Sequence, residues 1–469
     1  MRLAPRALPS LDVSERFSYD REAQPIGIVH LGLGAFHRAH QAVYTDAAMD
    51  AGDRGWAICG VSLRSIAARD QLEPQGGLYT VTERDGDGER TRLMGAIRSV
   101  LVGSEDPNTV MEAIASPATR VVTLTVTEKG YHSAVGGGLD VDAPDVADDL
   151  SSGPRKRTVF GFLADGLARR RTAGLPGLTL VSCDNLSNNG PRLAENLAQF
   201  LDVVDPALRR WFEDKCSAPA TMVDRIVPAT TPEQVDALEA RCGFRDEAAV
   251  FTEPFSQWVI EDRFAGPRPR WEAGGAQFVF DVKPYEEAKL RMLNGAHSAL
   301  AYLGLQRGHT YIHQAIADPR IRPLIKRLML IEAAPTLSPT PELHCDDYAF
   351  RLLERFANPA LDHRLDQIAM DGSQKIPQRW FPTLRYHQKS GLQCPAILES
   401  LAAWLLHVRL GPPAVADPLA ETLATIWRDA GNKQVATALF GRGGLFASAW
   451  TATVADLDFL QRRLTGPLL

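Results

Sequence analysis

Short apolar runs alternate with longer segments of helical spacing over the first 283 residues. Runs of roughly four to eight apolar residues predict strands, and apolar residues three and four apart predict helices. Residues 25–52 have the pattern of a strand, a tight glycine turn and a helix. This alternation indicates a mostly parallel sheet with helices on both faces. The other predicted strands are 56–63, 120–131, 178–185 and 221–228, with a β-excursion at 78–84 and 91–102 and helices at 159–174 and 190–204.

The pattern changes near residue 283, and helical spacing dominates from there onward. Pro284 suits the first turn of a helix, and Glu286 and Glu287 are favourable near its positive end. We therefore predict an α/β domain over residues 1–283 and a mostly α-helical domain over residues 284–469. Predicted helices of the second domain are 298–304, 321–334, 347–358, 396–410 and 419–431.

The composition is that of a soluble globular protein. Of 469 residues, 45% are hydrophobic and 23% charged, and the net charge of -6 disfavours nucleic acid as a partner. No apolar run reaches transmembrane length, and the N-terminus lacks the apolar core of a secretory leader. Six scattered cysteines without C-x-x-C spacing favour free thiols in a reducing compartment. We infer a cytoplasmic protein.

The turn after the first predicted strand reads GLGAF and places Gly32, Gly34, Ala35 and Phe36 before a helix. Glycines here permit a tight bend and let the backbone approach a pyrophosphate at the helix N-terminus. The third glycine of the dinucleotide-binding pattern is missing, because His37 stands in its place. An ordinary strand–helix turn is the alternative. The surrounding β/α alternation favours a Rossmann-type dinucleotide site.

The second strand leaves the choice of dinucleotide open. An acidic residue usually follows this strand and holds the ribose of NAD. Here the strand ends GVSLR, with Ser62 and Arg64. Arg64 suits the 2′-phosphate of NADP, or it is a solvated surface arginine.

The stretch KLRMLNGAH places polar side chains in a helical, leucine-rich run. At about 100° per residue, Lys289, Asn294 and His297 share a side with Leu293. A lysine on a buried face must be paired or lose its proton, and a lysine of lowered pKa can act as a general base. The alternative is a lysine that extends to solvent beside an ordinary core histidine. Asn and Gly both disfavour helix interiors, which favours a functional role for this segment.

Two other polar residues follow predicted strands. Asn185 lies in SCDNLSNNG and Glu128 in TVTEKGY. Ligands of open α/β sheets bind outside the carboxyl ends of the strands, so Asn185 is a candidate to bind a substrate oxygen. A plain turn is the alternative for Asn185, and a helix cap is the alternative for Glu128.

The segment QIAMDGSQKIPQR predicts a tight turn that presents Gln374, Lys375 and Arg379. A lysine and an arginine beside a turn suit a carboxylate or a polyhydroxylated ligand. A solvated basic loop is the alternative. His37 and His40 are three residues apart but have no carboxylate or cysteine at matching distance, so we predict no metal site.

Several of these stretches together resemble the mannitol dehydrogenase family of long-chain, zinc-independent polyol dehydrogenases. The resemblance covers the chain from about residue 26 to past residue 400. The motifs that carry it are IVHLGLGAFHRAHQA, TEKGY, SCDN, TMVDRIVP, KLRMLNGAHSALAYLG, RFANPALDHR and DGSQKIPQR.

The resemblance implies a Rossmann-type domain, a helical domain and an active site between them. It assigns the catalytic lysine to Lys289, two carbonyl-polarising asparagines to Asn185 and Asn294, and an orienting histidine to His297. The lysine of the D-G-S-x-K turn is Lys375.

Mannitol-oxidising members resemble one another in an arginine and a histidine just before that turn. This chain has Gln367 and Met370 there, which favours the sugar-acid branch of the family. The implied reaction is the interconversion of D-mannonate and D-fructuronate with NAD, NADP not being excluded. The alternative substrates are mannitol, arabinitol and altronate.

Overall fold

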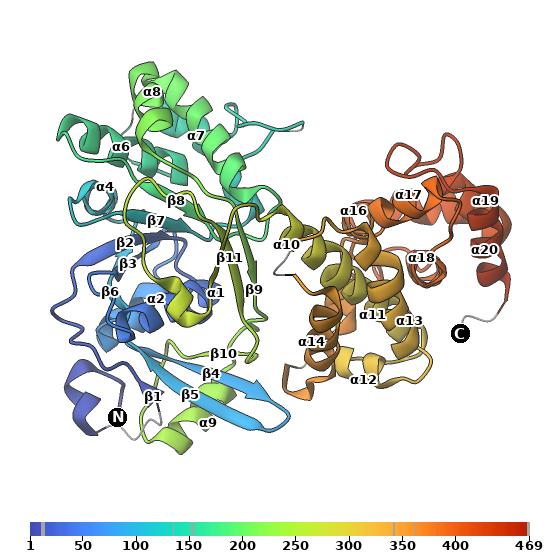
Figure 1. The fold of residues 1–469 in the computed structure, drawn as a ribbon, viewed down its shortest axis with the longest axis horizontal. Coiled ribbons are helices and arrows are strands. Elements are labelled where there is room, and N and C mark those ends of the chain that lie inside the picture. The colour runs from blue at the N-terminus through green and yellow to red at the C-terminus, as the bar shows by residue number, and fades with distance from the viewer. Residues whose placement is uncertain are drawn as a thin grey trace. The chain divides into compact units, whose positions relative to one another are not determined.

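The computed structural model describes residues 1–10, 15–134, 136–151, 153, 155–340, 343–361 and 363–466. The chain divides into two compact units, Met1–Val282 and Lys283–Leu469. The first is α/β and the second helical (Figure 1). This confirms the predicted fold class, a Rossmann-type, mostly parallel sheet domain followed by a mostly α-helical one.

The main sheet of the first unit has five strands in the described residues, in the order β6-β3-β2-β7-β8. Every neighbouring pair in it is parallel. All five carboxyl ends therefore lie at one edge of the sheet. The strands are β2 (Ile26–Leu31), β3 (Ala57–Ser62), β6 (Ile97–Val102), β7 (Val121–Leu124) and β8 (Thr179–Ser182).

Side chains alternate between the two faces of this sheet, as the strand pleat requires. Val29 and Leu31 of β2 pack with one cluster of helices, whereas Ile28 joins a second cluster with Trp258 and Trp271. Figure 1 shows α6, α7 and α8 on one side of the sheet and α2 on the other. The helices of the first cluster are α4 (Pro107–Ala115), α5 (Pro144–Leu150), α6 (Val159–Thr172), α7 (Asn189–Val204) and α8 (Pro206–Lys215). Those of the second cluster include α1 (Ala35–Ala39) and α2 (Gln41–Asp50).

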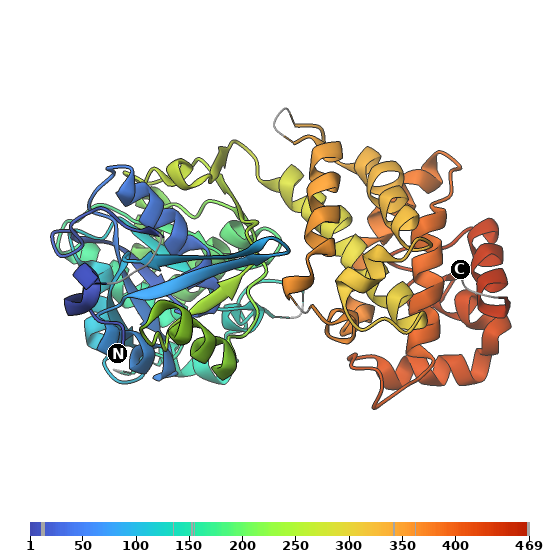
Figure 2. The ribbon, with the colours of Figure 1, turned by 90° about the horizontal axis from the view of Figure 1, so that it is seen from below.

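Two smaller sheets complete the described part of this unit, in the orders β1-β5-β4-β10 and β12-β11-β9. The predicted β-excursion at 78–84 and 91–102 is only partly right: β4 and β5 form a long hairpin (Figure 2), whereas the end of the second run is β6, which pairs with β3 in the main sheet. The predicted strand at 221–228 belongs to the smaller sheet, where β9 pairs antiparallel with β11. The elements are β1 (Glu15–Arg16), α3 (Ala67–Leu72), β4 (Tyr79–Asp85), β5 (Gly88–Met94), β9 (Thr221–Asp224), α9 (Pro232–Cys242), β10 (Val250–Thr252), β11 (Gln257–Glu261) and β12 (Gln277–Val279).

The second unit is built around α11 (Gly295–Gln306). Nine of its residues are buried, because its Ala, Leu and Gly side chains are apolar on every side and helices surround it. Tyr302 donates from its hydroxyl to the carbonyl of Ala369, 2.9 Å away. The other α-helices of this unit are α10 (Lys283–Ala288), α12 (Ile312–Ala317), α13 (Arg322–Arg327), α14 (Cys345–Ala357), α15 (Leu365–Ala369), α16 (Gly372–Arg379), α17 (Phe381–Lys389), α18 (Pro395–Val408), α19 (Ala420–Phe440) and α20 (Val454–Thr465), of which α12, α13, α15, α16 and α18 pack against α11.

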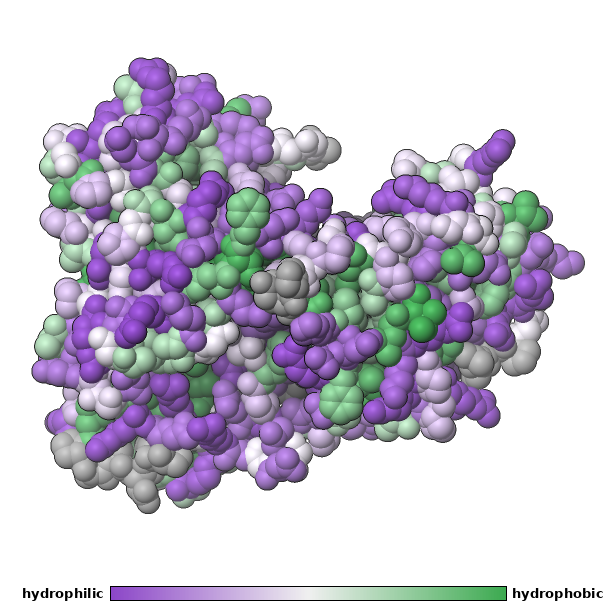
Figure 3. Space-filling view, viewed as in Figure 1, coloured by the Kyte–Doolittle hydropathy of each residue, from purple (hydrophilic) through white to green (hydrophobic). Residues whose placement is uncertain are grey.

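On the face drawn in Figure 3, hydrophilic residues predominate and hydrophobic ones are scattered among them. None of the described helices combines the length and the apolar character needed to cross a bilayer.

Candidate functional site

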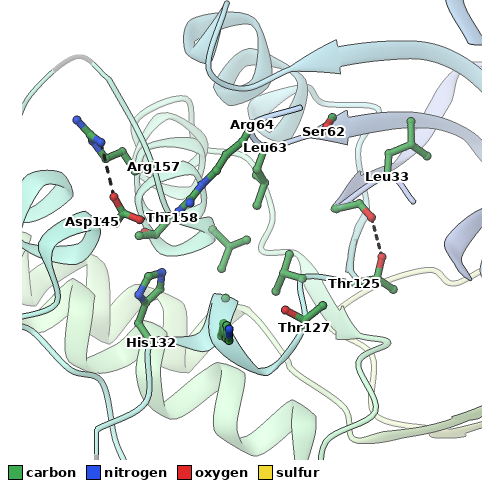
Figure 4. Close-up of a pocket in the computed structure, with 15 residues that line it drawn as sticks. Leu33, Ser62, Leu63, Arg64, Thr125, Thr127, His132, Asp145, Arg157 and Thr158 are labelled. Carbon is green, nitrogen blue, oxygen red and sulfur yellow. Dashed lines mark hydrogen bonds and ion pairs between the residues drawn. The ribbon is translucent and has the colours of Figure 1, made fainter. Parts of the chain in front are cut away.

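A cavity of about 500 Å³ opens at the carboxyl edge of the main sheet. It is lined by Gly32 and Leu33 after β2, by Ser62 at the end of β3 with the next two residues, and by the residues 125–127 after β7 (Figure 4). The chain runs from β2 outward through β3 to β6 and then returns to β7 on the other side of β2. The cavity therefore lies where the strand order reverses, which is where open α/β sheets bind ligands.

Gly32 and Gly34 of the turn differ in whether the packing around them requires a glycine. Gly32 has φ +101, and a Cβ there would lie 2.1 Å from the carbonyl oxygen of Thr125. The fold itself therefore needs glycine at this position. Gly34 has an ordinary φ of -130, and the nearest atom to an added Cβ would be the carbonyl oxygen of Gly32 at 3.8 Å. Packing does not require Gly34, whereas the close approach of a ligand would.

The helix after the turn is shorter than the pattern predicts. Ala35 and Phe36 open α1, which ends at Ala39, and α2 begins at Gln41. The break falls at His40, whose φ and ψ are -124 and -92. His40 is held there by a 2.9 Å hydrogen bond between its Nε2 and the carbonyl of Gln257. Its role in the described structure is to join α2 to β11.

His37 is buried and stacks on His30, with ring centroids 3.4 Å apart. His30 contacts the hydroxyls of Thr123 and Thr125 at 2.8 and 2.9 Å. Burial lowers the pKa of His30 to about 3 and that of His37 well below 6.5. Both rings are therefore neutral at physiological pH and form part of the packing beneath the glycine turn.

Charged residues line the outer part of the cavity. Arg64 is 68% exposed and pairs with Asp145 at 2.5 Å, and Arg157 lies 3.6 Å from the same carboxylate (Figure 4). Lys129 and His132 also line this part. The position after β3 thus carries a cation, as the sequence indicates, and Asp145 is its ion-pair partner.

Asp184 joins the loops that follow β7 and β8. Its Oδ1 accepts from the backbone N–H of Thr127 at 2.8 Å, and its Oδ2 accepts from the hydroxyl of Tyr131 at 3.0 Å. Thr127 has φ +66, a strained conformation that these bonds stabilise. Burial raises the pKa of Asp184 to about 6. Next to these anchors, Glu128 and Asn185 are exposed at the same edge of the sheet.

In the helical unit, Lys289–Asn294 form a π-helix instead of the expected α-helix. The N–H of Gly295 donates to the carbonyl of Leu290, five residues back. A π-helix advances by only about 80° per residue, so Lys289 and Asn294 lie about 40° apart rather than the roughly 140° of an α-helix. His297, three α-helical residues further, lies within roughly 20° of Lys289. The wide turn therefore brings all three polar side chains onto one face.

The end of α16 supports this turn. Arg379 donates from Nη1 to the carbonyl of Asn294 at 3.2 Å and to the hydroxyl of Ser298 at 2.7 Å. Trp380 donates from its indole to the carbonyl of Gly295 at 3.1 Å. Burial lowers the pKa of Arg379 to about 10, which keeps the guanidinium charged. These contacts fix the backbone that carries Asn294.

The residues after Met370 form a helix rather than the tight turn expected from Asp-Gly-Ser. Asp371 takes a left-handed conformation with φ +56, and α16 starts directly after it. Lys375 donates from Nζ to the carbonyl of Met370 at 2.6 Å, and burial lowers its pKa. Gln374 is exposed on the same helix.

His297 lies in a strongly basic environment. Burial, and then the charges of His363, Arg355, Arg379 and Lys289, hold its pKa well below 6.5. Its ring lies 4.9 Å from that of Phe356 and 5.4 Å from that of His363. Sequence reasoning missed Arg355 and His363 as site residues. Both lie in the stretch RFANPALDHR, which carried the family resemblance but offered no helical or strand spacing toward His297.

Two family models match this chain: the mannitol dehydrogenase Rossmann domain over residues 26–273 and the mannitol dehydrogenase C-terminal domain over residues 281–448. D-mannonate oxidoreductase of Escherichia coli (strain K12) is 40% identical to it over 442 residues, which are 92% of this chain and 91% of that protein. Mannitol 2-dehydrogenase of Phaeosphaeria nodorum is 41% identical over 399 residues, 84% of this chain and 70% of that protein.

Among solved structures, mannitol 2-dehydrogenase of Pseudomonas fluorescens, in a ternary complex with NAD and D-mannitol, superposes with a TM-score of 0.83. The two are 35% identical, and the match covers 98% of this chain and 96% of that one. Both the sequence matches and the fold confirm the resemblance found in the motifs. The chain belongs to the mannitol dehydrogenase family.

Proposed function

We propose that this protein interconverts D-mannonate and D-fructuronate with NAD as the redox partner. The observation that carries the proposal is the π-helical turn, which aligns Lys289, Asn294 and His297 on one face within a basic environment. An amine, an amide and an imidazole suit proton transfer at a secondary alcohol. The surrounding cations suit a substrate that carries a carboxylate.

In the oxidation, Lys289 in its neutral form removes the hydroxyl proton. The side-chain amide of Asn294 donates a hydrogen bond to the oxygen as it becomes negative, and we assign Asn185 the same role. Arg379 keeps the backbone of Asn294 in place. The neutral ring of His297 orients a substrate oxygen. Gln374 and Lys375 are proposed to bind the polar groups of the substrate further along its chain.

The cavity at the edge of the main sheet fits a dinucleotide. Gly32 lines it, and at Gly34, two residues further on, the protein leaves room where a methyl group would otherwise stand. Ala35, Phe36 and Glu128 are proposed to border the cofactor. When bound there, NAD accepts the hydride that leaves the substrate carbon. Arg64 provides a cation near the expected ribose, so NADP is the alternative cofactor.

A polyol is the second candidate substrate, favoured by the similar identity to mannitol 2-dehydrogenase. Mannitol and arabinitol are uncharged, whereas altronate is another sugar acid. Gln367 and Met370 stand where mannitol-oxidising members are expected to have an arginine and a histidine, and both are exposed. These residues, with the cations around His297, favour the sugar acid.

The six cysteines are all free thiols. Free thiols persist in reducing compartments, so we propose that the enzyme works in the cytoplasm on a small-molecule substrate.

Initial rates of NADH formation test the proposal. D-mannonate and D-mannitol are compared at equal concentration with NAD and then with NADP. We expect D-mannonate with NAD to be the best pair. A clear preference for mannitol would refute the assignment of a sugar acid. Lys289→Ala should lower turnover of the better substrate by at least about 10³-fold, within the range of general-base catalysis, while NADH binding stays within about twofold. Near-normal turnover in this variant would remove lysine from the mechanism.

A further inference from the structure

No acidic residue directly follows β3, where an NAD site normally has one. The chain continues after this strand as Leu63, Arg64 and Ser65. In Rossmann-type domains an acid near this strand binds the ribose 2′-hydroxyl of NAD, whereas an arginine there accommodates the 2′-phosphate of NADP. Residue type along the strand alone therefore favours NADP.

Asp145 brings a carboxylate to this place from another part of the chain. Its Oδ2 lies 2.5 Å from Nη2 of Arg64, which is 81 residues away in sequence. Both side chains line the cavity at the edge of the main sheet, and Figure 4 shows Asp145 beside Arg64 and Arg157. Asp145 lies in the first turn of α5. The acid that is missing after β3 is thus supplied by tertiary structure.

Arg157 is a second cation of the cavity wall, and it too is paired with carboxylates. Its Nη1 lies 3.6 Å from Oδ1 of Asp145, and its Nε lies 2.7 Å from Oδ2 of Asp148. Among the described residues, the lining of the cavity includes Asp145 but not Asp148. Two guanidinium groups are therefore matched by two carboxylates, of which Asp145 is the one that faces the ligand space.

The backbone around α5 fixes the position of Asp145. Asp149, one turn later, is buried and accepts hydrogen bonds from the N–H groups of Arg157 and Thr158 at 2.9 and 2.8 Å. Val146, next to Asp145, is fully buried in the cluster of helices beside the main sheet. These contacts hold α5 against the segment that carries Arg157, so the arrangement of the three charged side chains is built into the fold.

The two dinucleotides differ in charge at the ribose. NAD has a hydroxyl at the 2′ position, which can donate a hydrogen bond to a carboxylate. NADP has a phosphate there, with roughly two negative charges. A phosphate beside Asp145 would meet a like charge, and it would have to separate Arg64 from its partner in order to pair with it. A repulsive contact of this kind excludes one ligand while the other still binds.

We propose that Asp145 makes this protein select NAD over NADP. Its carboxylate accepts a hydrogen bond from the ribose of the cofactor and keeps Arg64 paired, so that the cavity does not recognise a 2′-phosphate. The inference rests on the proposed function, because it names the residue that decides between the two dinucleotides considered there. Arg64, which by residue type suits NADP, becomes a residue that positions Asp145.

Asp145→Asn and its matched control Asp148→Asn test this proposal. Each substitution removes one negative charge from α5 and one partner of Arg157, but Asp145 also pairs with Arg64 and lines the cavity. Fluorescence titration gives the Kd values of NADH and NADPH at low and at high salt. The values of kcat/KM for NAD and NADP with the better substrate provide a second comparison.

The wild type should bind NADH at least about tenfold more tightly than NADPH. Asp145→Asn should lower this preference by at least about tenfold, and its gain in NADPH affinity should shrink at high salt. Asp148→Asn should change the preference by less than about threefold, because the carboxylate in the cavity is retained. Adding Arg64→Gln to Asp145→Asn should remove the gain for NADPH, since the cation that would pair with the phosphate is lost.

Arg64→Gln alone provides a test that does not depend on the folding of the Asp145 variant, because the Arg64 side chain is 68% exposed. It should weaken NADPH binding, since Asp145 is then no longer balanced by Arg64, while NADH binding changes by less than about threefold. Equal effects on the two dinucleotides, an unchanged preference in Asp145→Asn, or a wild type that prefers NADPH would overturn the inference and leave oxidation of the sugar acid standing. A protein that binds neither dinucleotide would instead refute the proposed function.

Discussion

The substitution Gly34→Ala distinguishes an effect on folding stability from an effect on cofactor binding. The backbone there is extended, with φ -130 and ψ -175, which alanine adopts without strain. The added methyl would have its nearest neighbour at 3.8 Å. Loss of freedom in the unfolded chain should stabilise the variant by about 0.4–1 kcal/mol. Alanine is a poorer N-cap than glycine by about 0.5–1 kcal/mol. The two effects offset each other, so the free energy of unfolding should change by less than about 1 kcal/mol.

Binding of the cofactor should change much more. The methyl group would occupy the space through which the backbone approaches a pyrophosphate. We expect the Kd for NADH to rise at least tenfold, which corresponds to about 1.4 kcal/mol. Fluorescence titration with NADH gives the affinity, and urea unfolding gives the stability of the same preparation.

Gly32→Ala is the contrasting control. Its Cβ would lie 2.1 Å from the carbonyl oxygen of Thr125, and its φ of +101 is unfavourable for alanine. This variant should lose stability by several kcal/mol as well as affinity. Wild-type NADH affinity in a folded Gly34→Ala variant would show that the cofactor does not approach this turn, and would refute the reasoning.

Three further changes have distinct expected outcomes. The pKa of Asp184 is raised from 3.8 to about 6, so its contribution to stability is present below about pH 4 and lost as the pH rises through 6. Between pH 4 and pH 7, the free energy of unfolding of Asp184→Asn should therefore rise relative to that of the wild type by up to roughly 3 kcal/mol, as measured by urea unfolding. A difference between the two proteins that does not change with pH would contradict this. Arg379→Gln should lower kcat at least tenfold through misplacement of Asn294 and leave NADH affinity unchanged; full activity would show that Arg379 is not needed to hold the turn, to which Trp380 also donates. Leu300→Ala, at a fully buried position, should cost about 2–5 kcal/mol in urea unfolding, and a cost below 1 kcal/mol would show that the core around α11 is loosely packed.

Much of the fold could be predicted because local patterns determine it. The β-branched runs of β2, β3, β7 and β8 and the change of pattern near Pro284 are visible in the sequence. Pairing between distant strands is not. The run at 221–228 looks like a fifth parallel strand, but β9 pairs antiparallel with β11. The break at His40 depends on a hydrogen bond to Gln257, more than 200 residues away.

The candidate site divides in the same way. Gly32, Arg64 and Lys289 stand out by residue type and position. α-Helical spacing places Lys289 and Asn294 on one side of the helix, but their close alignment depends on a π-helix, which that spacing does not predict. The Asp-Gly-Ser stretch favours a turn by propensity, but packing continues it as α16 from Gly372. Arg355 and His363 meet His297 only through tertiary structure, so no spacing along the chain could reveal them.

The pairing of β10 with β4 has a consequence for biosynthesis. Val250 pairs with Val81, and Leu3 donates a backbone hydrogen bond to Arg245. The N-terminal unit therefore cannot complete its smaller sheets until residue 279 of the 469 has left the ribosome. The helical unit follows it along the chain, and helical domains are in general rich in local contacts and fold rapidly. During translation, the ribosome therefore synthesises the helical unit while the smaller sheets of the N-terminal unit are still forming.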